Sequence, residues 1–203
     1  VDVGAAFGIH HQFEKYVGSH SLSLTMFEPF LDEARKLRLK YPDANLLEVA
    51  LSDYNGTAIL NETEHPGCSS IRLPNKIFLE QFSCASWFTV VNRHEIPVAR
   101  YDTLFADGKV PVPDYLKIDV QGLEYEVLRG FGNLLDQILV VELEASFYEV
   151  YVGQKLFHEL IDLLARHGLM LHVNLHATLH NFGNIYVEAS SAYFIRTHID
   201  ANK

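Results

Sequence analysis

The sequence has little cysteine, little positive charge and no long apolar run, and each shortage excludes a class of protein. Two cysteines, Cys68 and Cys84, among 203 residues are too few for a disulfide framework and are typical of a reducing compartment such as the cytoplasm. No apolar run approaches the roughly 18 residues of a membrane span, so no membrane partner is expected. The formal net charge of −10, with no compensating basic run, disfavours a nucleic-acid partner.

The remaining composition is that of a globular protein, with 48% hydrophobic and 21% charged residues. The length suits one α/β domain with its own core, so residues 1–203 are expected to form a single domain. Residues 61–93 are a candidate cap or insertion within it. Residues 1–3 look like the end of a core strand, and we therefore expect a further segment before Val1.

Short apolar strands alternate with amphipathic helices along the chain. This alternation predicts an α/β fold, a parallel sheet with helices on both faces. The dipeptide Asn55-Gly56 predicts a hairpin turn, and residues 175–184 are expected to form a polar, histidine-rich loop. The expected strands are residues 1–3, 22–27, 45–51, 57–60, 88–91, 96–99, 115–120, 138–143, 169–173 and 192–196, and the clearest helices are residues 30–40 and 154–167.

The first loop, from Asp2 to Gly8, has an acid and two glycines directly after a strand. The three-glycine spacing of a nicotinamide site is not met, because Ala6 and Ile9 stand where glycines are needed. A wide glycine pair suits a cofactor without a pyrophosphate, of which S-adenosylmethionine is the common one. Gly4 would let the methionine end approach the backbone, and Asp2 would accept from its ammonium group. A plain tight turn after a buried strand is the alternative interpretation.

Two further strand ends complete the predicted cofactor site. Glu28 ends the second strand about 20 residues after Gly8, where nucleotide-binding α/β folds place the acid that binds the ribose hydroxyls. A carboxylate offers two acceptor oxygens to a vicinal diol, although a solvated acid at a strand end is the alternative. Leu51 and Ser52 end the third strand, where the adenine is expected.

Several short motifs follow one another along nearly the whole chain: residues 2–8, Phe27-Glu28-Pro29, Ala50-Leu51-Ser52 with Asn55-Gly56, Cys68-Ser69-Ser70, residues 116–124 with Val127-Leu128-Arg129-Gly130, and Val140-Val141-Glu142. In this order and spacing they resemble the FkbM family of methyltransferases. The resemblance implies a Rossmann-like class I methyltransferase fold, a mostly parallel seven-stranded sheet with helices on both faces and an antiparallel last strand. It also implies S-adenosylmethionine as cofactor and a hydroxyl of a sugar or natural product as acceptor. The family usually has Asn where Ala6 stands and Glu where Gln121 stands.

Methyl transfer to a hydroxyl requires a positioned acceptor and a group that takes its proton. Asp119 and Glu142 both end central strands and are the first candidates, and His180 is a further candidate base. Two acids alone are a weak metal signature, so no metal site is predicted. The predicted cofactor contacts are Asp2, Val3, Gly4, Gly8, Glu28, Pro29, Leu51, Ser52 and Asp119, and the predicted acceptor contacts are His172, His176 and Asn181.

Two other functions stay open at this point. A nicotinamide-dependent oxidoreductase can have the same general fold, although the missing third glycine disfavours it. A non-catalytic domain that binds a cofactor is the other, and Ala6 and Gln121 are the features that favour it.

Overall fold

The computed structural model describes residues 1–6, 8–9, 11–19, 22–181 and 185–197, with the backbone alone for residues 11–12, 173–181 and 185–190. Among these residues, no helix is long and apolar enough to cross a membrane. The strands are β1 (Asp2–Val3), β2 (Thr25–Phe27), β3 (Asn45–Leu47), β4 (Ala50–Leu51), β5 (Gly56–Thr63), β6 (Val90–Ala99), β7 (Tyr115–Ile118), β8 (Val140–Ser146), β9 (Leu169–Asn181) and β10 (Ile185–Arg196). The helices are α1 (His11–Glu14), α2 (Leu31–Lys40), α3 (Lys76–Leu79), α4 (Tyr101–Ala106), α5 (Glu124–Phe131) and α6 (Phe157–Arg166), with short 3₁₀ helices η1 (Pro66–Cys68), η2 (Ala85–Phe88) and η3 (Gly132–Gln137).

The main sheet has seven strands in the order β3-β2-β1-β7-β8-β10-β9. The five strands from β3 to β8 pair in parallel, and β10 runs antiparallel to both of its neighbours. The predicted fold class, a mostly parallel seven-stranded sheet with an antiparallel last strand, is therefore confirmed. The short β1 lies at the centre of the parallel part, between β2 and β7.

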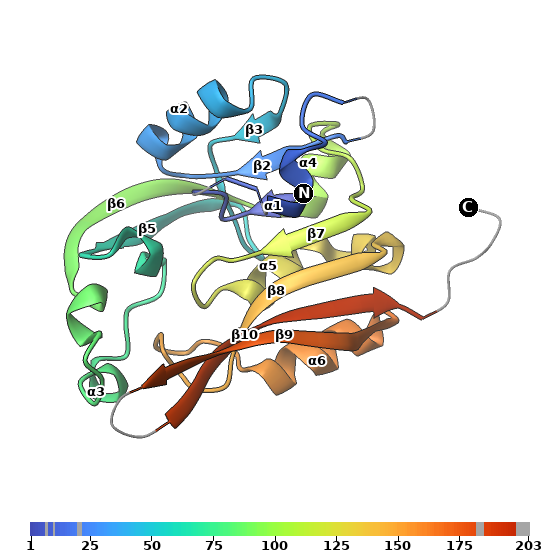
Figure 1. Ribbon diagram of the computed structural model, residues 1–203. Helices are drawn as coiled ribbons and strands as arrows, with labels where there is room; N and C mark the ends of the chain where they lie inside the picture. Colours follow the sequence, from blue (N-terminus) through green and yellow to red (C-terminus); the bar gives the residue numbers. More distant parts are fainter. Residues whose placement is uncertain (7, 10, 20–21, 182–184, 198–203) are drawn as a thin grey trace.

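Both faces of the main sheet are covered by helices (Figure 1). Met26 and Phe27 are neighbours on β2, so their side chains point to opposite faces. Met26 packs in a cluster with Ala34 of α2, whereas Phe27 belongs to the larger core under α4, α5 and α6. In that core the rings of Tyr101 and Phe131 stack with 4.0 Å between their centroids. Apolar residues on both faces of the parallel strands thus anchor the sheet as the sequence pattern predicts.

A second sheet of three strands, in the order β4-β6-β5, lies beside the carboxyl ends of the main sheet (Figure 1). Residues 45–51, expected as one strand, are divided between the two sheets as β3 and β4. The expected hairpin at Asn55-Gly56 is wrong, because β6 lies between β4 and β5. Asn55 instead holds the start of α4: its Oδ1 accepts from the Arg100 N–H at 2.9 Å and its Nδ2 donates to Thr103 Oγ1 at 3.1 Å.

Two other expectations are corrected by the observed strand pairing. The strands expected at 88–91 and 96–99 are one strand, β6, paired with β5 along most of its length. The loop expected at 175–184 is wrong over residues 175–181, which continue β9 and pair with β10. The polar side chains of this segment favour a loop. Pairing with β10 nevertheless uses backbone hydrogen bonds, which polar side chains do not prevent.

Candidate functional site

A pocket lies at the carboxyl ends of β1, β2, β4 and β7, and the second sheet with its loops supplies another wall. Open α/β sheets bind ligands at this edge. The predicted cofactor residues that line it are Val3, Gly4, Glu28, Pro29, Leu51 and Asp119, while Asp2, Gly8 and Ser52 do not. The sequence interpretation missed the other lining residues, Ala6, Phe27, Phe30, Val49, Ala50, Leu60, Pro66, Gly67, Ser69, Ser70, Ile71, Ile96, Val120, Gln121 and Leu123.

Gly4 allows two strand ends to approach each other at the floor of the pocket. Its φ is +79°, a conformation that side chains rarely adopt, and a Cβ at this position would lie 1.8 Å from the Asp119 carbonyl oxygen. The N–H groups of Gly4 and Ala5 both donate to the Phe27 carbonyl at 3.2 Å, which joins the loop to the end of β2. No other residue fits position 4 without moving the Asp119 backbone.

Asp2 and Gly8 serve the structure outside the pocket. The buried Asp2 side chain points to the face of the sheet opposite Val3, and its Oδ1 lies 3.2 Å from Lys117 Nζ. Burial raises the pKa of the Asp2 carboxyl, and the Lys117 ammonium partly offsets that effect. A Cβ on Gly8 would lie 2.6 Å from the Tyr41 hydroxyl oxygen, so this glycine lets the first loop pack on the end of α2.

Glu28 presents a buried carboxyl group to the pocket. The residue is 4% exposed, and its Oε1 accepts from the Phe30 N–H at 2.8 Å. Among the described residues, none hydrogen-bonds Oε2. Burial raises the pKa of this carboxyl to about 7, despite the hydrogen bond from Phe30, which favours the charged form. A ligand that donates hydrogen bonds to Glu28 would stabilise the carboxylate.

At the end of β4, Leu51 lines the pocket and Ser52 does not. Leu51 lines the pocket together with Val49 and Ala50, which gives this wall an apolar character. Ser52 is turned away: its N–H donates to the Ala99 carbonyl at 3.0 Å. Its own carbonyl packs against α5 so closely that a Cβ on Gly130 would lie 2.1 Å from the oxygen.

The turn from Asp119 to Gly122 contains an unusual backbone conformation. Gln121 has a φ of +56°, which is strained for a residue with a side chain. Its Nε2 donates to Asp119 Oδ1 at 3.0 Å and to Glu144 Oε2 at 2.8 Å. The Tyr151 hydroxyl lies 2.9 Å from Gln121 Oε1 and donates toward it. The amide of Gln121 therefore connects two carboxyl groups with a buried tyrosine.

The loop after β5 fixes the same turn from the other side. Ser70 Oγ donates to the Gln121 carbonyl at 2.6 Å, and Arg72 Nε donates to the Gly122 carbonyl at 2.9 Å. Arg72 also forms an ion pair with Glu126 at 2.7 Å. The second sheet thus both lines the pocket and holds the backbone of the Asp119 turn.

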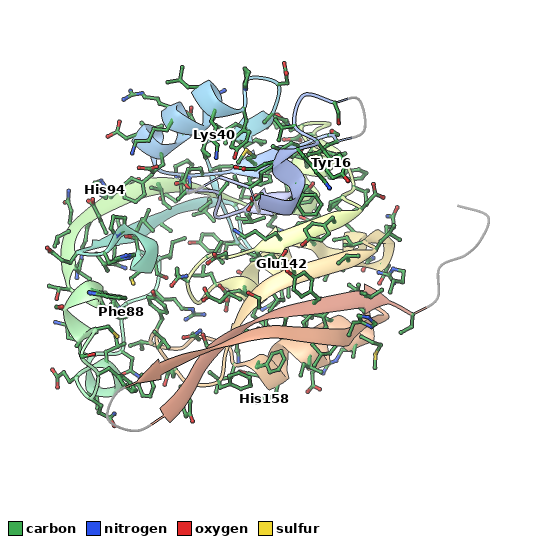
Figure 2. All side chains as sticks on the ribbon, viewed as in Figure 1. Tyr16, Lys40, Phe88, His94, Glu142 and His158 are labelled. Atoms are coloured by element: carbon green, nitrogen blue, oxygen red, sulfur yellow. The ribbon has the colours of Figure 1, made fainter. Side chains whose placement is uncertain are left out.

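The two acids on β8 have different surroundings. Glu142 lies opposite Lys117, accepts a short hydrogen bond from the Tyr115 hydroxyl and does not line the pocket. Figure 2 shows it over the central strands, apart from His94 and Phe88 on the side of the second sheet. Glu144, two residues further along the strand, reaches the Asp119 turn, and the sequence interpretation missed it. The contact depends on the register of β7 with β8, which pairs Ile118 with Leu143 and has no local signal in the sequence.

The predicted acceptor residues all belong to β9. His172 is exposed. The backbone of His176, His180 and Asn181 continues the strand, while their side chains lie outside the described part of the chain. Within that described part, no group of three or more His, Cys, Asp or Glu residues could hold a metal ion.

Comparison with known proteins identifies the family of this chain. Residues 2–169 match the methyltransferase FkbM domain. The chain belongs to the FkbM methyltransferase family. A crystal structure of methyltransferase FkbM from Methylobacillus flagellatus KT has the same fold, with a TM-score of 0.53 and 13% identity, over 95% of this chain and 42% of that chain. The predicted family is therefore confirmed.

Two curated relatives share shorter stretches with this FkbM chain. The hexuronic acid methyltransferase AglP of Haloferax volcanii is 43% identical over 47 residues, 22% of this chain and 20% of the relative. The 2-O-methyltransferase NoeI of Sinorhizobium fredii is 29% identical over 126 residues, 59% of this chain and 50% of the relative. The chain thus spans half or less of the length of these relatives.

Proposed function

We propose that this chain binds S-adenosylmethionine in the pocket and transfers its methyl group to a hydroxyl of a sugar or natural-product acceptor. The observation that carries the proposal is the buried Glu28 carboxyl group, which lines the pocket with no described partner on Oε2. Membership of a methyltransferase family supports the reaction. The names of the two relatives, a hexuronic acid methyltransferase and a 2-O-methyltransferase, support a sugar hydroxyl as acceptor.

The lining residues suit the parts of this cofactor. Glu28 offers carboxylate oxygens to the ribose hydroxyls, and the apolar wall around Leu51 suits the adenine. Gly4 lines the pocket and brings the first loop against the Asp119 backbone, so the methionine end would lie beside this backbone contact. In this proposal Asp2, Gly8 and Ser52 support the pocket walls from behind.

Bound S-adenosylmethionine supplies an electrophilic methyl group on a sulfonium. The chain must align the acceptor oxygen with that methyl group and remove the hydroxyl proton. Asp119 lines the pocket at the central strand end and is the proposed proton acceptor. Lys117 Nζ, 3.7 Å from Asp119 Oδ2, balances part of its charge. On β9, His172, His176 and Asn181 remain proposed acceptor contacts, and His180 remains a candidate base.

The direct test is transfer of an isotope-labelled methyl group to a panel of sugar glycosides, analysed by mass spectrometry. We expect a labelled methyl ether on a hexuronic acid or a hexose with a free 2-hydroxyl. Cofactor binding without transfer to any acceptor would favour a non-catalytic binding domain. Binding of a nicotinamide cofactor in place of S-adenosylmethionine would favour the oxidoreductase alternative.

A further inference from the structure

Glu144 is brought to the floor of the pocket by strand register. Asp119 directly follows β7, and the pairing of Ile118 with Leu143 places Asp119 beside Glu144 on the neighbouring strand. One amide nitrogen, Gln121 Nε2, donates to a carboxyl oxygen of each residue, at 3.0 and 2.8 Å. Asp119 lines the pocket, whereas Glu144 lies behind it. The two carboxyl groups therefore form a pair with one member facing the ligand space.

Residues outside the pair fix the positions of the Asp119 and Glu144 carboxyl groups. The Tyr151 hydroxyl lies 2.9 Å from both Gln121 Oε1 and the Cys68 carbonyl oxygen, and the amide NH₂ of Gln121 faces the two carboxyl groups. Ser70 Oγ donates to the Gln121 carbonyl at 2.6 Å and keeps the residue at its positive φ. These contacts hold the strained turn and orient the Gln121 amide toward both carboxyl groups.

More negatively than positively charged groups surround the Asp119 and Glu144 carboxyl groups. Burial, followed by the charges of Asp119 and Glu124, raises the pKa of Glu144 to about 8. The described polar and charged groups around the pair are Asp119 and Gln121 from the turn, Lys117 from β7, Glu124 from α5, and Ser191, the register partner of Glu144 on β10. Among these, Lys117 is the one cation, so the pair retains a proton at neutral pH.

We propose that Asp119 and Glu144 act as one proton-accepting unit, in which Asp119 meets the acceptor hydroxyl and Glu144 is the positioning residue that makes Asp119 a stronger base. This inference rests on the proposed function. The acceptor O–H bond breaks, its oxygen bonds to the methyl carbon, and the carbon–sulfur electron pair stays on sulfur. The proton passes to Asp119 and is then shared with Glu144.

The chemical reason is base strength. A lone carboxylate has a pKa of about 4 and is a poor base for a hydroxyl, whereas the pair becomes a stronger base once it has lost its shared proton, above about pH 8. Two adjacent carboxylates repel each other, so the first proton that they bind is held much more tightly. Without Glu144, the pocket would keep the Asp119 carboxyl group but lose the neighbouring carboxyl with which it shares the proton.

The first arm of the test needs no ligand. Carbon-13 NMR of the chain labelled at its Asp and Glu carboxyl carbons should show a resonance that titrates near pH 8 and is absent in Glu144→Gln. In Asp119→Asn the same resonance should titrate at lower pH, because the like charge has been removed. A Glu144 resonance that titrates near pH 4, or is unaffected by Asp119→Asn, would overturn the pair.

The second arm is the pH profile of methyl transfer from S-adenosylmethionine to the methyl glycoside of a hexuronic acid, between about pH 6 and 10. The wild-type rate at saturation should rise through pH 8, whereas Glu144→Gln should be about 10²-fold slower at pH 8 and lack this inflection. Glu95→Gln, the same change at an exposed position on β6, is the control and should follow the wild type.

The outcomes separate the two proposals. Equal rates and equal pH profiles in wild type and folded Glu144→Gln would overturn the pair while leaving the methyltransferase function standing. A wild-type chain that binds no S-adenosylmethionine, or transfers no methyl group to the probe, would count against the proposed function and the pair's part in it, even if the coupled NMR titration were observed.

Discussion

A Cβ on Gly4 would lie 1.8 Å from the carbonyl oxygen of Asp119, so the first loop and the central strand end are in direct backbone contact. This contact joins the two segments that line the floor of the pocket. Glycine is required there for two reasons, a φ of +79° and the absence of space for a side chain. The cofactor loop and the proposed base therefore depend on each other for their positions.

Gly4→Ala should destabilise the chain by about 3 kcal/mol or more, because it combines an unfavourable φ with a steric clash. Gly18→Ala is a matched control: Gly18 has a φ of +74° but nothing within 4 Å of the added Cβ. Gly18→Ala should destabilise the chain by only about 1 kcal/mol, because it has the unfavourable φ without the steric clash. Urea unfolding of both variants measures the difference, and equal losses would show that the contact with Asp119 is unimportant.

Glu28 should make stability depend on pH. Its pKa in the folded chain is about 7, above its ordinary 4.5, so the folded state binds the proton more tightly. The stability of the unliganded chain should therefore fall as the pH rises from about 5 to 7, by up to about 3 kcal/mol from this group. Glu28→Gln stays neutral and should lose less stability over that interval.

The pKa values of Glu124 and Glu144 are also raised, so these two groups change the stability with pH in the same direction. Both groups are present in wild type and in Glu28→Gln, so the difference between the two proteins isolates Glu28. Thermal unfolding at pH 5 and pH 8 measures it. Identical pH dependence in the two proteins would mean that Glu28 titrates in its ordinary range.

Tyr151→Phe should affect the reaction more than the fold. The change removes the hydroxyl that lies 2.9 Å from both Gln121 Oε1 and the Cys68 carbonyl oxygen, and both acceptors lose this partner at a total cost of about 1–2 kcal/mol. The Gln121 amide is then less well oriented toward the acids, so the transfer rate should fall while the affinity for S-adenosylmethionine changes little. Tyr16→Phe, at the end of α1 far from the second sheet (Figure 2), is the control. Equal rates in both variants would contradict the role of the amide.

Asp119→Asn and Glu142→Gln distinguish the two acids that the sequence proposes as bases. Asp119 lines the pocket, whereas Glu142 is hydrogen-bonded to Tyr115 outside it. We expect Asp119→Asn to lower the single-turnover rate by about 10²-fold or more, with a smaller change in cofactor affinity. Glu142→Gln should lower the rate much less. The reverse order of the two effects would move the proton acceptor to β8.

Local sequence pattern was sufficient to predict much of this architecture. The apolar segments and their terminal residues predict the parallel strands, and the motifs around Gly4, Glu28 and Asp119 predict the family and the pocket edge. These features depend on residues close together in the chain. They required no knowledge of strand order.

The features that the sequence interpretation missed depend on how strands pair. The second sheet forms because β6 inserts between β4 and β5, although Asn55-Gly56 alone favours a hairpin. Glu144 reaches Asp119 only through the register of β7 with β8. In the same way, polar residues 175–181 join the main sheet because β10 pairs with them. The first two contacts join segments far apart in the sequence, whereas β10 follows β9 after residues 182–184.

The central claim is that the pocket holds S-adenosylmethionine through Glu28, and isothermal titration calorimetry of wild type and Glu28→Ala tests it most directly. We expect the cofactor and its demethylated product to bind the wild type, and Glu28→Ala to weaken binding by about 1.5–3 kcal/mol, the range for hydrogen bonds to charged groups. Bound ligand should also raise the unfolding temperature of the wild type by mass action. No binding by the wild type, or unchanged affinity in a folded Glu28→Ala chain, would contradict the account.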